Sequence, residues 1–145
     1  MVLNEKKISD LAFGFNEEEK LLPFLKDYFK NDNIEKTKEK NNLFDYTCDG
    51  IKIELKSRRI PHNKYDSLIF GKNKYDKGIE YINDNEKVYY IFNCIDGIYL
   101  WEQTTTQTPQ FKKGGRFDRG RPEVQLLTNV PTEYLKKLDT LPEVE

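Results

Sequence analysis

The chain has 145 residues, of which 37% are hydrophobic and 34% are charged, and its formal net charge is −1. This length fits one domain over residues 1–145 with its own core. No apolar run is long enough to span a membrane, and the first ten residues lack the apolar centre of a secretory signal, so we expect a soluble, intracellular protein that is not secreted.

The first predicted element is a helix that follows Asn16. Asn16 suits the N-cap, and the acidic run Glu17 to Glu19 suits the positive end of the helix dipole. Glu18 leads the apolar stripe of this helix, whereas the other two glutamates flank the stripe. The stripe consists of Leu21, Leu22, Leu25 and Phe29. The polar segment that follows, residues 31–42, is expected to be a loop or an edge strand.

The stretch FDYTCDGIKIELKSRR, residues 44–59, predicts a β-hairpin. Its Asp49-Gly50 pair favours a two-residue type I′ turn, in which cross-strand partners have numbers that sum to 99. On the polar face, Asp45 then lies opposite Glu54. The other face is expected to carry only apolar side chains, namely Phe44, Tyr46, Cys48, Ile51, Ile53 and Leu55.

The polar face of this hairpin brings together Asp45, Glu54 and Lys56. Directly opposed side chains have Cβ atoms roughly 4.5–5.5 Å apart, and like charges at that spacing are destabilising. Either Lys52 and Lys56 neutralise the two carboxylates on a solvated face, or the carboxylates hold a divalent cation such as Mg²⁺.

Asp45, a turn and then Glu54-Leu55-Lys56 resembles the motif of the PD-(D/E)XK nuclease superfamily, with Phe44 in place of the usual preceding proline. The resemblance covers roughly residues 15 to 95. It implies an α/β, restriction-endonuclease-like core in the order α-β-β-β-α-β, with a mixed central sheet and a C-terminal extension. It also implies catalysis by Asp45, Glu54, Lys56 and Glu18.

The same resemblance implies a Mg²⁺ site, with Mn²⁺ able to substitute. Asp45, Glu54 and the Leu55 carbonyl are the implied ligands, and Lys56 orients or deprotonates the attacking water. Glu18 is the position onto which the resemblance carries a further ligand from the first helix. The alternative for Glu18 is a solvent-facing glutamate matched to the helix dipole.

After the hairpin, Arg58 and Arg59 leave the strand close to Lys56, where guanidinium groups suit backbone phosphates. His62 follows a proline in a basic loop, which favours a surface residue or phosphate contact over a general base. A short extended segment, residues 66–70, comes next.

Residues 72–84 predict a second helix, which Gly78 weakens by about 1 kcal/mol relative to alanine. Lys72 and Lys74 stand at its start, either near the active face as DNA contacts or on a solvated helix end. The side chains expected to point inward are Tyr75, Ile79 and Ile82.

Residues 86–102 predict a second hairpin around Asp96-Gly97. Its first strand, Val88 to Ile95, is nearly continuous in apolar residues and is expected to be the central strand, buried on both faces. Cys48 and Cys94 lie in predicted strands without a CxxC motif, which favours small buried hydrophobic residues over a disulfide or zinc site.

Residues 103–122 change from a polar linker or solvent-facing strand to a basic, glycine-bearing loop. The loop is expected to contact phosphates, the alternative being a mobile basic loop. Residues 123–127 predict an edge strand and residues 131–138 a short amphipathic helix. The expected phosphate contacts are Lys112, Lys113, Arg116, Arg119 and Arg121.

The net charge of −1 argues mildly against nucleic-acid binding, but residues 51–122 contain fourteen Lys and Arg against nine Asp and Glu. A basic middle with acidic ends is compatible with a DNA-facing cleft. We therefore predict a Mg²⁺-dependent DNA endonuclease, similar to members from phages and large DNA viruses, that hydrolyses phosphodiester bonds with a metal-activated water.

Three alternatives stay open at this point. One is a Holliday-junction resolvase of the same fold, which implies a homodimer. Another is a nucleic-acid-binding module that has kept the fold without catalysis. The third is an interaction protein in which the polar face of the hairpin is simply solvated.

Overall fold

The computed structural model describes residues 19–37, 44–116 and 123–138. Three predicted site residues, Glu18, Arg119 and Arg121, lie outside the described residues. The backbone of Arg116 is described, but its side chain is not. In the described part of the chain, no helix is long and apolar enough to cross a membrane.

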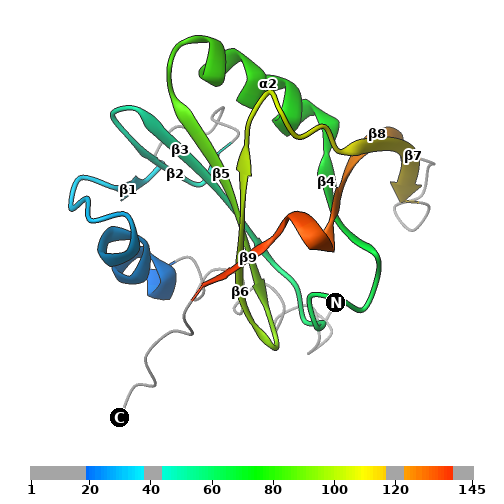
Figure 1. Ribbon diagram of the computed structural model, residues 1–145, viewed down its shortest axis with the longest axis horizontal. Helices are drawn as coiled ribbons and strands as arrows, with labels where there is room; N and C mark the ends of the chain where they lie inside the picture. The colour runs from blue at the N-terminus through cyan, green and yellow to red at the C-terminus, as the bar shows by residue number, and fades with distance from the viewer. Residues whose placement is uncertain (1–18, 38–43, 117–122, 139–145) are drawn as a thin grey trace, which may run out of the picture.

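A mixed six-stranded sheet forms the centre of the described structure (Figure 1). Strands β3 and β5 are parallel, and all other neighbouring pairs are antiparallel. In spatial order the strands are β1 (Glu35–Lys36), β2 (Tyr46–Cys48), β3 (Ile51–Ser57), β5 (Lys87–Cys94), β6 (Gly97–Gln103) and β9 (Lys136–Leu138).

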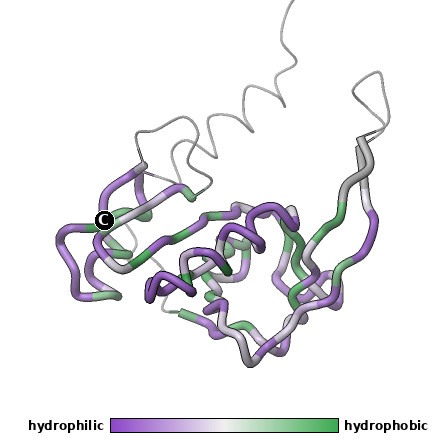
Figure 2. Tube along the Cα trace, turned by 90° about the horizontal axis from the view of Figure 1, so that it is seen from above, coloured by the Kyte–Doolittle hydropathy of each residue, from purple (hydrophilic) through white to green (hydrophobic). Residues whose placement is uncertain are grey.

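A second, three-stranded antiparallel sheet has the order β4-β8-β7. Its strands are β4 (Ser67–Gly71), β8 (Glu123–Pro131) and β7 (Gln110–Arg116). Helix α2 (Lys72–Asn83) follows β4 directly, and the short 3-10 helix η1 (Thr132–Tyr134) connects β8 to β9. Figure 2 looks down on α2, whose turns are mostly hydrophilic on the side that faces the viewer.

The two faces of the six-stranded sheet carry separate hydrophobic clusters. On one face, the helix at residues 19–28 buries Leu21 and Leu25 against residues that include Ile53 and Ile91. On the other face, α2 and the small sheet cover residues that include Tyr90. The molecule is therefore layered, with the sheet between the first helix and the layer formed by α2 and the small sheet.

The sequence of strand β5 is apolar almost without interruption because both of its faces are buried. Its odd-numbered residues Tyr89 and Ile91 belong to the cluster under the first helix, and its even-numbered residues Tyr90 and Phe92 belong to the cluster under α2. The prediction of a central strand buried on both faces is confirmed.

The register of the first hairpin is confirmed. Tyr46 pairs with Ile53, Thr47 with Lys52 and Cys48 with Ile51. The predicted type I′ turn was wrong, because that turn requires a positive φ at both central residues, whereas Gly50 has a φ of 83° and Asp49 does not have a positive φ. The prediction for Phe44 was wrong. Because β2 begins only at Tyr46, the strand alternation does not reach Phe44, which packs in the cluster under α2 with its ring 5.9 Å from that of Tyr90.

The C-terminal predictions were wrong in three respects. The described part of the basic segment expected as a loop, residues 111–116, belongs to strand β7, and the predicted edge strand is the longer β8, which lies between β4 and β7. Residues 131–138 form η1 and β9 rather than an amphipathic helix. The local sequence pattern favours a helix here, but strand pairing decides the structure, because β9 hydrogen-bonds to the edge of β6, with Leu138 opposite Ile98.

The predicted order α-β-β-β-α-β is interrupted in the structure, because β4 stands between β3 and α2 and belongs to the second sheet. The structure shows a mixed α/β fold with a predominantly β, mixed central sheet. This arrangement is compatible with a restriction-endonuclease-like core.

Candidate active site

The candidate site is built around Glu54 in the middle of β3. Residues alternate along this strand, so Ile53 and Leu55 pack under the first helix while Glu54 points toward the α2 side. Glu54 is only 1% exposed, because β3 lies inside the sheet between β2 and β5. A carboxylate at this depth requires compensating charge or hydrogen bonds.

Two lysines compensate one oxygen of Glu54. Lys56, two residues further along β3, places Nζ 3.4 Å from Oε2, and Lys74 from the first turn of α2 forms an ion pair with the same oxygen. The other oxygen, Oε1, is buried and has no hydrogen-bond partner among the described residues. Glu54 thus has one compensated oxygen and one uncompensated oxygen.

Asp45 contacts the strand that carries Glu54, but it does not lie in the predicted cross-strand position. The ladder between β2 and β3 ends at the Tyr46–Ile53 pair, so Asp45 is not the ladder partner of Glu54. Instead its Oδ2 accepts the backbone N–H of Leu55 at 2.8 Å. The side chain therefore takes the place of a backbone acceptor at this position, next to the residue that follows Glu54.

The electrostatics of Lys56 connect Asp45 to the same cluster. Burial lowers the pKa of Lys56, the nearby charge of Arg58 lowers it further, and the carboxylate of Asp45 acts in the opposite direction. Asp45 is therefore close enough to Lys56 to influence its charge. We call Asp45, Glu54, Lys56 and Lys74 the carboxylate–lysine cluster.

The donor set of this cluster fits a divalent cation. In the described part of the chain, no group of three or more His, Cys, Asp or Glu side chains converges. Two carboxylates are nevertheless sufficient for Mg²⁺, which usually keeps several waters. The unpartnered Oε1 of Glu54 and the second oxygen of Asp45 are the candidate ligands. The Leu55 carbonyl lies on the same strand edge as its N–H, which faces Asp45.

The basic residues predicted to contact nucleic acid have different surroundings. Arg58 donates to the backbone oxygens of Ser57 and Ile69, each at 3.2 Å, so its guanidinium ties the end of β3 to β4. Lys72 pairs with Asp76 at 2.8 Å. The remaining described ones, Arg59, Lys112 and Lys113, are exposed.

Lys74 was predicted as a DNA contact, and its pairing with Glu54 was missed. The ion pair joins α2 to β3 across 20 residues of sequence, and no short-range pattern predicts how closely a helix approaches a strand. The available signal was Gly78, a glycine inside a helical pattern, which often marks close packing. The structure buries Gly78 against the side chain of Gln103.

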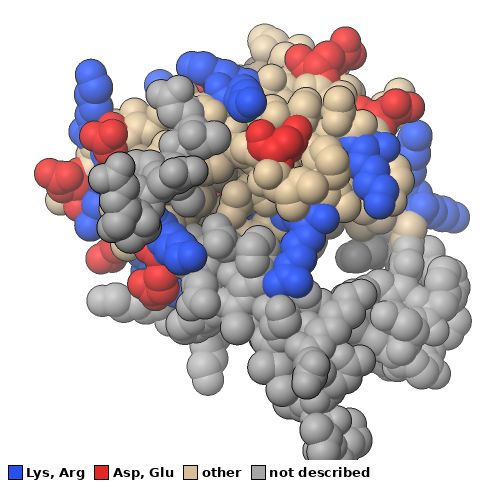
Figure 3. Space-filling model, turned by 90° about the horizontal axis from the view of Figure 1, so that it is seen from below, with Lys and Arg blue, Asp and Glu red and all other residues tan. Residues whose placement is uncertain are grey.

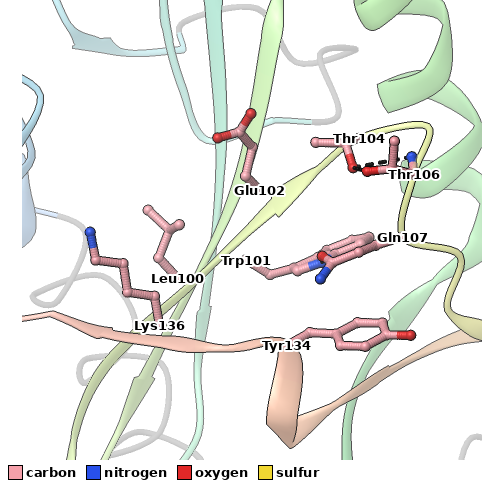
Figure 4. Close-up of a pocket in the computed structure, with 8 residues that line it drawn as sticks. All are labelled: Leu100, Trp101, Glu102, Thr104, Thr106, Gln107, Tyr134 and Lys136. Atoms are coloured by element: carbon pink, nitrogen blue, oxygen red, sulfur yellow. Dashed lines mark hydrogen bonds between the residues drawn. The ribbon is translucent and has the colours of Figure 1, made fainter.

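A separate open pocket of about 380 Å³ lies along the outer edge of β6 (Figure 4). Trp101, Gln107 and Tyr134 line it, and the Trp101 indole N–H donates to Gln107 Oε1 at 3.1 Å. None of its lining residues belongs to the carboxylate–lysine cluster. We therefore place the candidate chemistry at Glu54 and not in this pocket.

The model of a family described as phage putative PDDEXK endonuclease matches residues 37–138. The matched span contains the whole carboxylate–lysine cluster and every element from β2 to β9. No curated protein and no solved structure matches the chain.

Proposed function

The chain belongs to the phage putative PDDEXK endonuclease family, and from this premise we propose that it is a Mg²⁺-dependent DNA endonuclease. It hydrolyses phosphodiester bonds with water as the nucleophile and without a covalent enzyme intermediate. Its fold is a restriction-endonuclease-like core to which the second sheet is added.

The observation that carries this proposal is the unpartnered Oε1 of Glu54. A buried polar atom that lacks a partner costs about 1–3 kcal/mol, and more when the group is charged. Two lysines already occupy the other oxygen, so the protein has the means to neutralise Glu54 but leaves Oε1 open. A site for a divalent cation explains this arrangement, since a cation supplies the missing partner.

Three members of the carboxylate–lysine cluster then have direct roles. Asp45, Glu54 and the Leu55 carbonyl would hold the ion, and by resemblance Glu18 would add a ligand directly or through water. When bound, Mg²⁺ polarises the scissile phosphate and lowers the pKa of a coordinated water. Lys56 would orient the attacking water and counter the negative charge that develops on the phosphate oxygens.

The DNA contacts are proposed from the basic residues around this cluster. Arg59, just after β3, and Lys72, at the start of α2, lie between Lys56 and Lys74 along the chain. Lys112 and Lys113 on β7 extend the set, and Arg116, Arg119 and Arg121 belong to it by their place in the sequence. Arg58 contributes by holding β3 to β4 as well as by its charge.

The proposal is tested by comparing Asp45→Asn with Asp49→Asn. An asparagine at position 45 keeps an oxygen that accepts the Leu55 N–H but loses the charge that a cation requires. Asp49 is exposed in the turn of the same hairpin, where asparagine is as well suited to a turn as aspartate. With Mg²⁺ and plasmid, linear duplex or branched DNA, we expect Asp45→Asn to cleave at least about 10²-fold more slowly than the wild type. Asp49→Asn should cleave at the wild-type rate.

The metal site is tested without DNA by thermal unfolding in Mn²⁺. A ligand at 100 times its dissociation constant stabilises the native state by about 2.7 kcal/mol. Wild type and Asp49→Asn should therefore melt at a higher temperature in millimolar Mn²⁺ than in EDTA, whereas Asp45→Asn should show little change. The absence of any Mn²⁺ effect on the wild type would contradict the site.

The other candidate functions correspond to other results of the same experiments. Cleavage confined to four-way junctions, with a dimer by light scattering, would identify a resolvase. Binding of DNA without cleavage in Mg²⁺ or Mn²⁺ would identify an inactive binding module. A protein that neither responds to Mn²⁺ nor binds DNA would be an interaction protein.

A further inference from the structure

The two lysines that pair with Glu54 belong to two different elements. Lys56 belongs to the same strand, and Lys74 belongs to α2, which lies over the sheet. The lysine side chains are 24% and 21% exposed, while the Glu54 side chain is 1% exposed. Glu54 is therefore shielded from solvent, whereas both lysine side chains are partly exposed.

One lysine is not sufficient to compensate the charge of Glu54 if the same lysine also takes part in the reaction. Lys56 is the residue proposed to orient water and to counter charge on the phosphate. Moving its ammonium group toward either target takes it away from Glu54 Oε2, and a buried carboxylate that loses its partner is strongly destabilised. An ion pair between Lys74 and Oε2 that persists during this movement would keep Glu54 compensated.

The position of Lys74 is fixed by a polar connection between α2 and the sheet. Tyr90 is the register neighbour of Glu54 on β5. Its hydroxyl donates to Gln103 Oε1 at 2.7 Å and lies 3.2 Å from the backbone oxygen of Lys74. Gln103 Nε2 in turn donates to the backbone oxygen of Tyr75 at 3.0 Å. Both contacts fall on the first turn of α2, the turn that carries Lys74.

Gly78 permits this close approach of α2. A Cβ atom at this position would collide with Gln103 Oε1. Gln103 is itself 2% exposed and is held at both ends of its amide, so it has little freedom to move away. We call Tyr90, Gln103 and Gly78 the α2 clamp.

We propose that Lys74 is a positioning residue of the active site. It holds Glu54 by Oε2, so that Oε1 is presented to the cation, and it keeps Glu54 compensated when Lys56 engages water or phosphate. The α2 clamp sets the distance at which Lys74 does this. This inference rests on the proposed metal-dependent function and adds a residue from α2 to it.

The test compares Lys74→Met with Lys74→Arg, and uses Lys77→Met as the matched control. Lys77 lies one turn further along α2 and pairs with Glu80 at 3.2 Å, outside the carboxylate–lysine cluster. Two quantities are measured, and the cleavage assay is run below the melting temperature of every variant. The first is the rate of duplex cleavage at saturating Mn²⁺, and the second is the Mn²⁺ concentration at the midpoint of the thermal shift without DNA.

We expect Lys74→Met to cleave about 10²-fold more slowly than the wild type, the loss typical of removing one preorganised electrostatic group. Its Mn²⁺ midpoint should fall at least about threefold, because a positive charge near the ion is gone. Lys74→Arg restores the charge with a different shape and should recover most of both properties. Lys77→Met should match the wild type in both.

A merely structural role for Lys74 would lower the melting temperature of Lys74→Met but leave its Mn²⁺ midpoint unchanged. Cleavage by Lys74→Met within about threefold of the wild type, at an unchanged midpoint, would overturn the inference while the Asp45→Asn result still supports the function. If the wild type does not cleave DNA, the proposed function fails, and the Mn²⁺ midpoints alone decide the role of Lys74. A wild type that shows no Mn²⁺ response overturns both.

Discussion

His62, the sole histidine of the chain, is held by one carboxylate in two ways. Its backbone N–H donates to Asp96 Oδ1 at 2.9 Å, and its Nδ1 lies 2.5 Å from Asp96 Oδ2. A carboxylate only accepts, so Nδ1 carries the proton in this contact. The ring also stacks on Tyr99 at 4.1 Å. These contacts connect the loop after β3 to the turn between β5 and β6.

The pairing of Asp96 with His62 predicts a stability that depends on pH. Burial acts to raise the pKa of Asp96, but the hydrogen bonds and charge of His62 outweigh burial, and the pKa lies below the ordinary value of 3.8. A depressed carboxyl pKa stabilises the folded state above the unfolded value and loses this effect as the pH falls through the folded value. Asp96→Asn should therefore lower stability at pH 6 by up to about 1 kcal/mol, the range for exposed ion pairs.

This difference between Asp96→Asn and the wild type should shrink below about pH 4, as the wild-type carboxyl becomes protonated. Thermal unfolding of both proteins in EDTA across this pH range measures it. A difference that stays constant from pH 6 to pH 2.5 would contradict the assignment of the effect to the ionised carboxylate.

Asp45 and Lys74 show how far the contacts of a single residue can be predicted from the sequence. The turn at Asp49-Gly50 correctly placed Asp45 beside β3, but the backbone ladder ends one residue earlier because the Asp45 carboxylate accepts the Leu55 N–H. Competition between a side chain and the backbone for one donor is decided by geometry at the hydrogen-bond scale. The ion pair of Lys74 with Glu54 depends on how α2 packs on the sheet. Neither the residue type of Lys74 nor its position in the sequence pattern predicts this packing.

Among the elements, α2 offers a test in which helix propensity and packing predict opposite signs. Alanine is about 1 kcal/mol more favourable than glycine inside a helix. In Gly78→Ala, however, the new methyl group displaces Gln103 and breaks its contacts with Tyr90 and Tyr75, leaving buried polar groups that cost about 1–3 kcal/mol each. We expect Gly78→Ala to lower the free energy of unfolding by about 1–3 kcal/mol in denaturant titrations.

The collision itself is checked by adding Gln103→Ala to Gly78→Ala. If the clamp is responsible, the two changes together cost less than the sum of their separate effects, because removing Gln103 makes room for the methyl group. A Gly78→Ala protein that is more stable than the wild type would show that α2 does not need this close approach.

The elements that the sequence predicted well are those with a strong local signal. The Asp49-Gly50 turn fixed the register of β2 and β3, and the helical pattern at residues 72–84 matches α2, with Tyr75 and Ile82 packed inward as expected. Ile79, also expected inward, is half-buried and is not part of that cluster. The elements predicted poorly are β7 and β9. β9 is a strand because β6, far away in the sequence, pairs with it, and β7 pairs with β8, whose other neighbour is the distant β4.

At the scale of the whole molecule, charge is distributed rather than concentrated. On the face shown in Figure 3, Lys and Arg side chains stand at several places with Asp and Glu between them. A net charge of −1 gives no overall attraction to DNA, so binding has to come from a few well-placed cations. For DNA binding, the placement of β7 relative to α2 therefore matters more than the total number of lysines.

The small sheet is joined to the start of α2 by aromatic contacts. Phe111 on β7 packs edge-on against Tyr75 with ring centroids 4.9 Å apart, and Lys72 Nζ lies 5.3 Å from the Phe111 ring. Phe111 therefore marks the face of β7 that turns toward α2. Because side chains alternate along a strand, Lys113 shares that face, and Lys112 is on the opposite face of the sheet.

This alternation makes two adjacent lysines a matched pair for locating the DNA. If duplex DNA lies across the α2 side, where the carboxylate–lysine cluster is placed, Lys113→Ala should weaken binding more than Lys112→Ala. Each phosphate contact contributes about one unit to the slope of log K against log salt concentration. Anisotropy titrations in EDTA at several salt concentrations should therefore show a slope reduced by about one for Lys113→Ala and changed less for Lys112→Ala. A larger effect of Lys112 would place the DNA on the outer face of the small sheet, away from α2, and equal losses would mean that the duplex contacts both faces of β7.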